Sequence, residues 1–145
     1  MTPTRKLKLV FFIPRASTQA VLRHLFARFP NHVGRIGAYG GCAFVSPGVG
    51  QFLPLEGANP AIGEVGRPEH VEEDRVEVLV LGAREREDPG GQGQGQGPLA
   101  AHGHSAADAG DGTGTGVEMA VVLEELKKVH PYEEVAYDVY RLEDF

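Results

Sequence analysis

The chain has 145 residues, of which 41% are hydrophobic, and this length predicts a single domain over residues 1–145. Its formal net charge of −6 at pH 7 argues against a nucleic-acid partner, because such binding draws on an excess of Lys and Arg. The single cysteine, Cys42, excludes an intramolecular disulfide and favours a reducing compartment. No apolar run reaches the roughly 18 residues of a membrane helix, so we expect a cytoplasmic protein without a membrane partner.

The N-terminal part of the chain predicts one strand and one helix. Residues 7–13 are apolar at nearly every position, which is typical of a strand buried on both faces, and Pro14 ends it. Ser17 or Thr18 can cap a helix, in which apolar residues recur at helical spacing as far as Phe29.

The glycine-rich segment 33–68 predicts short strands and an ordered loop. Residues 42–45 and 51–55 suggest two short strands on either side of a turn at residues 46–50. Residues 71–81 then predict a longer strand, because valines alternate with other residues along its second half.

A low-complexity segment interrupts the second half of the chain. Ten of the 28 residues from Pro89 to Gly116 are glycine, so little apolar surface is available to offset chain entropy. We therefore predict a disordered Gly-rich insertion at about residues 85–116. Helical spacing resumes over residues 119–129, and alternation over residues 135–140 predicts a closing strand.

Without the insertion, the element order is strand, helix, two short strands or a hairpin, long strand, helix, strand. This split β-α-β order predicts an α+β fold of the ferredoxin-like type, with one antiparallel sheet and both helices on one face. The other face of the sheet would be bare, so we expect a homo-oligomer as one way of covering it.

Several motifs together are similar to one domain of a known family. They are Gly37–Tyr39 with Cys42 and Phe44, Gly48–Phe52, Gly57–Gly63, the paired acids and Arg75 before the long strand, and His130–Tyr140. Over roughly residues 5–82 and 117–143 they resemble the domain inserted in many bacterial members of the Nif-three (YqfO) family, which also occurs alone. The resemblance implies a fold like that of PII signalling proteins and CutA, whose closing strand also follows a His-Pro-Tyr-Glu motif.

The resemblance also bears on catalysis. Full-length Nif-three proteins carry a dinuclear metal site of His, Asp and Glu in the halves that flank this insert, and some are named type 2 GTP cyclohydrolases. The chain begins at the first strand of the insert and ends at its last, so we expect the metal-bearing halves to be absent. We therefore expect no cofactor and no catalytic residue, and favour a protein that is not an enzyme.

Six residues carry candidate ligand-binding chemistry: Tyr39, Cys42, Glu64, His130, Tyr132 and Glu133. His130 and Glu133 could bind a metal or a small ligand, but a helix C-cap charge followed by a polar turn explains them more simply. Cys42 could be a thiolate ligand, although a lone cysteine before an apolar pair is more often buried. The acidic run at residues 72–74 indicates a solvated face.

Hypotheses from different classes follow. The first is a non-catalytic oligomeric binding or regulatory module, with a small-molecule or metal ligand held at a subunit interface near loop 34–66 and the His130 turn. The second is a metal-binding protein or metal-dependent enzyme that uses Cys42, His130 and Glu133, within one subunit or across a subunit boundary. A third is docking on a separately encoded metal-bearing partner. We favour the first, because the sequence contains no recognisable nucleophile–base pair or multi-ligand metal set.

Overall fold

The structure is a computed structural model that describes residues 4–83 and 116–145. The elements in chain order are β1 (Thr4–Pro14), a 3-10 turn (Arg15–Ser17), α1 (Thr18–Arg28), β2 (Phe44–Phe52), β3 (Glu69–Ala83), α4 (Met119–Val129) and β4 (Tyr137–Arg141). The predicted insertion lies, apart from its last residue, outside the described residues. Neither α1 nor α4 is long and apolar enough to cross a membrane.

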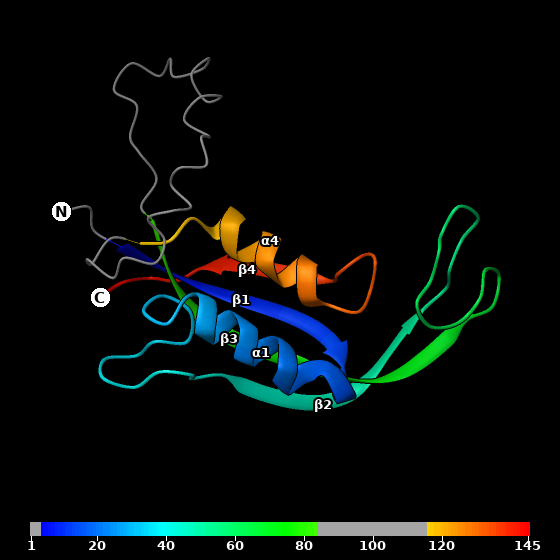
Figure 1. Cartoon of the computed structure of the whole chain (residues 1–145), viewed down its shortest axis with the longest axis horizontal. Helices are drawn as coiled ribbons and strands as arrows, with labels where there is room; N and C mark the ends of the chain where they lie inside the picture. Colours follow the sequence, from blue (N-terminus) through cyan, green and yellow to red (C-terminus); the bar gives the residue numbers. More distant parts are fainter. Residues whose placement is uncertain (1–3, 84–115) are drawn as a thin grey trace, which may run out of the picture.

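The four strands form one antiparallel sheet in the order β2-β3-β1-β4. Both helices cover the same face of this sheet (Figure 1). The predicted ferredoxin-like arrangement is therefore confirmed, and the closing strand β4 pairs with β1 as expected.

The hydrophobic core lies between the sheet and the two helices. The register of β1 on β3 places Phe11 opposite Val76 and Leu9 opposite Val78, so their apolar side chains share the covered face. Leu25 of α1 packs in the same cluster, as does Leu126 of α4. Residues before and after the undescribed segment thus build one core.

β2 is one continuous strand, so the predicted pair of short strands around a turn is wrong. Pro47 and Gly48 lie inside β2, opposite Asp74 and Glu73 of β3. A proline fits there because β2 is at the edge of the sheet, where one side of the strand needs no hydrogen-bond donor.

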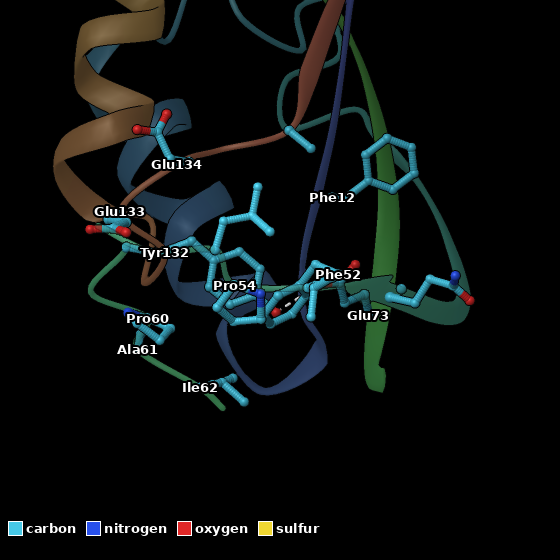
Figure 2. Close-up of a pocket in the computed structure, with 16 residues that line it drawn as sticks. Phe12, Phe52, Pro54, Pro60, Ala61, Ile62, Glu73, Tyr132, Glu133 and Glu134 are labelled. Carbon is cyan, nitrogen blue, oxygen red and sulfur yellow. Dashed lines mark hydrogen bonds between the residues drawn. The ribbon is translucent and has the colours of Figure 1, made fainter. Parts of the chain in front are cut away.

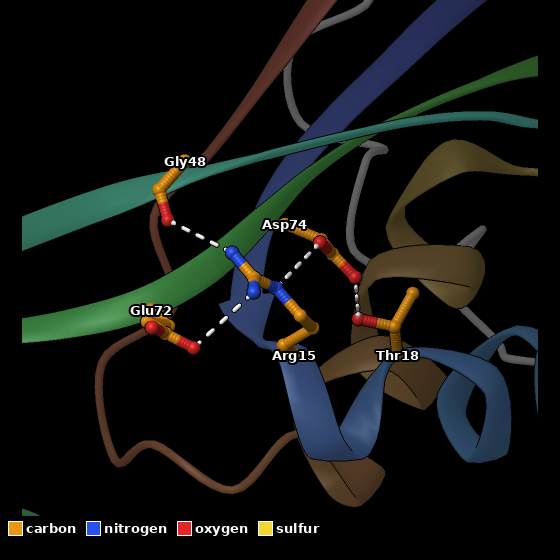
Figure 3. Close-up of polar contacts among 5 residues, drawn as sticks. All are labelled: Arg15, Thr18, Gly48, Glu72 and Asp74. Atoms are coloured by element: carbon orange, nitrogen blue, oxygen red, sulfur yellow. Dashed lines mark hydrogen bonds and ion pairs between the residues drawn. The ribbon is translucent and has the colours of Figure 1, made fainter.

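The acidic run at the start of β3 is also more buried than predicted. Glu73 and Asp74 are only 8% and 6% exposed, and Glu72 alone keeps an exposed side chain. Asp74 accepts a hydrogen bond of 2.7 Å from the Thr18 hydroxyl, and its carboxylate lies 3.5 Å from Arg15 (Figure 3). These partners at the start of α1 offset the cost of burying the charge.

The two ends of the sheet carry different loops. β2 and β3 extend beyond the helices as an arm, which residues 53–68 close at its far end (Figure 1). The turn at residues 130–136, between α4 and β4, lies toward the same end, whereas the loop at residues 29–43 lies at the opposite end (Figure 1). The arm and the 130–136 turn therefore frame one site.

Candidate functional site

A cavity of about 580 Å³ lies where the arm meets the 130–136 turn. Its walls come from β1, from residues 50–62, from β3 and from the turn (Figure 2). Most of the lining is apolar, with Phe12, Phe52, Leu53, Pro54, Ile62 and Tyr132 among the larger side chains. The volume falls in the range of roughly 300–1,000 Å³ that is typical of small-molecule sites.

His130 connects the turn to β1. Pro131 stops α4, and His130 takes an extended backbone conformation at φ −75° and ψ 140°. Its Nε2 lies 2.8 Å from the carbonyl oxygen of Phe12, and its Nδ1 lies 3.1 Å from the backbone nitrogen of Tyr132. A carbonyl only accepts, so Nε2 carries the proton and Nδ1 accepts from the Tyr132 N–H.

This geometry requires a neutral imidazole. His130 is 6% exposed, and its burial lowers its pKa, against the opposing effects of the Phe12 carbonyl and the nearby Glu73 carboxylate. His130 does occupy the C-cap position of α4, as predicted, but it carries no charge there, because Nε2 donates and Nδ1 accepts.

Tyr132 links the turn to β3. Its hydroxyl donates a hydrogen bond of 2.7 Å to Oε2 of Glu73 (Figure 2). Burial, the hydrogen bond and the negative charge of Glu73 together raise the pKa of Tyr132, so the phenol stays protonated and acts as a donor. Its ring also meets Phe52 edge-on, with 5.8 Å between the centroids.

Two local features complete the walls of the cavity. A Cβ added at Gly50 would collide with Oε1 of Glu73, so glycine at this position leaves room for the carboxylate against β2. On the other side, the backbone N–H of Asn59 donates to Oε2 of Glu133 at 2.9 Å, which ties the arm loop to the turn.

The structure brings three of the six predicted ligand-binding residues together. Tyr132 and Glu133 line the cavity, and His130 lies behind Tyr132 with its ring centroid 5.2 Å from that of the phenol. Glu64 belongs to the arm loop but lines a separate shallow depression, where it pairs with Arg67 at 2.9 Å. The binding roles of these residues stay predictions.

The other two predicted residues lie elsewhere. Tyr39, which is 74% exposed, and Cys42 belong to the loop at the opposite end of the sheet (Figure 1). Cys42 is half-buried rather than fully buried, and its thiol lies 3.8 Å from the carbonyl oxygen of Gly40. Sequence reasoning missed Phe12, Phe52 and Glu73 as lining residues. For Glu73 the available signal was Gly50, whose missing side chain leaves room for the carboxylate.

The donor set proposed for a metal is not assembled within the described part of one chain. Cys42 lies far along the sheet from His130 and Glu133 (Figure 1). Within residues 4–83 and 116–145 no group of three or more His, Cys, Asp or Glu side chains is arranged to hold a metal ion.

Comparisons with known proteins agree with the fold and with its motifs. The chain is 36% identical, over 135 residues, to the Mycobacterium tuberculosis protein named GTP cyclohydrolase 1 type 2 homolog. A Bacillus subtilis protein of the same name is 32% identical over 136 residues. The crystal structure of a Bacillus cereus protein related to NIF3 superposes with a TM-score of 0.60 at 28% identity, over 99% of this chain and 27% of that one. The chain is similar to one domain of proteins of the Nif-three family.

The similarity covers one part of those Nif-three proteins. The match takes in 93% of this chain but 26% of the Mycobacterium tuberculosis relative, and 94% of this chain but 26% of the Bacillus subtilis relative. No family model matches the chain. The match therefore does not assign the activity of the longer proteins to this chain.

We predict that Tyr132→Phe destabilises the protein by about 1–3 kcal/mol, because it leaves Oε2 of the buried Glu73 without its donor. Tyr140→Phe is the matched control, since Tyr140 is 49% exposed on β4 and its loss of a hydroxyl should change stability by less than about 0.5 kcal/mol. Urea unfolding followed by circular dichroism measures both. Equal effects of the two variants would contradict the importance of the Tyr132–Glu73 bond.

Proposed function

We propose that this chain acts as a non-catalytic binding module, and that the cavity between the arm and the 130–136 turn is its small-molecule site. The observation that carries the proposal is a largely apolar cavity whose walls are joined by side-chain hydrogen bonds. Tyr132 bonds to Glu73 across one wall, and Glu133 bonds to Asn59 across another. Such links hold a site open before the ligand arrives, which reduces the ordering cost of binding.

The name shared by the relatives suggests a metal-dependent hydrolase as an alternative. No observation on the described residues favours it for this chain. His130 already uses both ring nitrogens, and Cys42 lies at the other end of the sheet. We therefore do not propose hydrolase activity for this chain.

Binding in the cavity can be tested with a fragment library and ¹⁵N-labelled protein. We expect binders to shift the amide resonances of residues 50–62 and 132–136 and to leave those of Tyr39 and Cys42 unchanged. Ala61→Trp should fill the cavity and abolish these shifts, because Ala61 lines it.

Ala43→Trp is the control for this experiment, since Ala43 is an exposed residue at the opposite end of the sheet. This variant should bind fragments like the unaltered protein. A screen that finds no binder, or binders that are indifferent to Ala61→Trp, would contradict the proposal.

We also propose that the module is a single domain, acts in the cytoplasm and forms a homo-oligomer. Exposed apolar side chains on both edge strands support the last point: Phe44 is 66% exposed on β2, and Tyr140 is 49% exposed on β4. Contact between copies through these edges would cover them and pair the free strand edges. Size-exclusion chromatography with light scattering should give a multiple of the chain mass, and a strict monomer at micromolar concentration would contradict the proposal.

A further inference from the structure

We propose that the ligand of this cavity is a small amphipathic cation, in which a protonated nitrogen on an apolar body pairs with Glu73. The inference rests on the proposed function, because it assigns a chemical class to the ligand of the same site. Four observations support it: the partners of Glu73, the charges of the residues that line the cavity, its aromatic side chains and its other apolar side chains.

Glu73 is a largely buried carboxylate with one hydrogen-bond partner among the described residues. It is 8% exposed, and its Oε2 accepts the hydrogen bond from the neutral Tyr132 hydroxyl. Its Oε1 lies against Gly50 in the cavity wall and accepts no hydrogen bond from any described residue. No Lys or Arg in the described ranges forms an ion pair with Glu73.

A carboxylate in such surroundings is costly without a positive partner. His130, which is close enough to feel the charge of Glu73, is held neutral by its burial and by its two hydrogen bonds. A protonated amine or amidine that enters the cavity would give Oε1 both a donor and a compensating charge.

The rest of the lining favours the same sign of charge on the ligand. Two further carboxylates, Glu133 and Glu134, line the cavity from the turn, and the described residues that line it include no Lys, Arg or His. An anionic ligand such as a nucleotide phosphate would therefore meet like charge and no cationic partner. Phe52 and Tyr132 also line the cavity, and aromatic rings attract a cation.

The rest of the cavity lining is apolar and favours a ligand with an apolar body. Phe12, Pro54 and Ile62 present hydrocarbon to the cavity, and their contact with a hydrated polyamine would bury polar groups without partners. A single positive nitrogen attached to an aromatic or aliphatic group of modest size satisfies both parts of the site.

The class can be tested with three probes that differ only in their end group: 4-phenylbutylamine, 4-phenyl-1-butanol and 4-phenylbutyrate. Their dissociation constants are measured at pH 7 by titration of ¹⁵N-labelled protein. We expect the amine to bind about tenfold or more tightly than the alcohol, since the charge-assisted bond is made only by the amine. The carboxylate should bind most weakly.

Glu73→Gln should remove the advantage of the amine over the alcohol, because glutamine keeps an acceptor for Tyr132 but carries no charge. Glu72→Gln is the matched control: the residue is adjacent in β3 and points to the other face of the strand, so the advantage should persist. If Glu73→Gln does not fold, the comparison of the three probes on the unaltered protein still decides the class.

The outcomes separate the two proposals. An alcohol that binds as tightly as the amine, or three probes that all fail while the fragment screen finds cavity ligands, would overturn the cationic class and leave the binding module standing. Failure of the whole screen would overturn both. Tighter binding of an N-acetylated peptide with a lysine between two phenylalanines would indicate a protein side chain in place of a free small molecule, and would also overturn the inference.

Discussion

The contacts of the candidate site depend on one buried imidazole, that of His130, which connects β1 to the 130–136 turn. His130 donates to the backbone of β1 through Nε2 and accepts from the backbone of Tyr132 through Nδ1, and only one neutral tautomer can do both. The ring therefore sets where the turn leaves α4 and which way Tyr132 points. Tyr132 in turn holds one oxygen of Glu73, and the cavity forms between this pair and the arm. A change in the protonation of His130 would disturb each of these contacts.

Much of the fold could be predicted because its signals are local. Helical spacing located α1 and α4, and alternation located the second half of β3 and the closing strand. β2 was misinterpreted for the opposite reason: Pro47 and Gly48 have strong turn propensities, but pairing with β3 at a sheet edge overrides them. Local preference is a weak guide where tertiary pairing supplies the stabilisation.

The site was harder to predict, since its walls meet only through the register of the sheet. Tyr132 and Glu133 stood out because they follow the helix stop, and they do reach the cavity. Glu73 looked like part of a solvated acidic run, and its hydrogen-bond partner Tyr132 lies 59 residues away in the sequence. Tyr39 and Cys42 were chosen by residue type and as part of the motif at residues 37–44, and the fold places their loop at the other end of the sheet.

The geometry of the site therefore depends on the state of one side chain, which long-range ¹⁵N–¹H correlation spectroscopy of the His130 ring observes directly. At pH 7 we expect a neutral ring, with a proton on Nε2 and a lone pair on Nδ1. A ring protonated on Nδ1 alone, or on both nitrogens, could not accept the Tyr132 amide and would contradict the account.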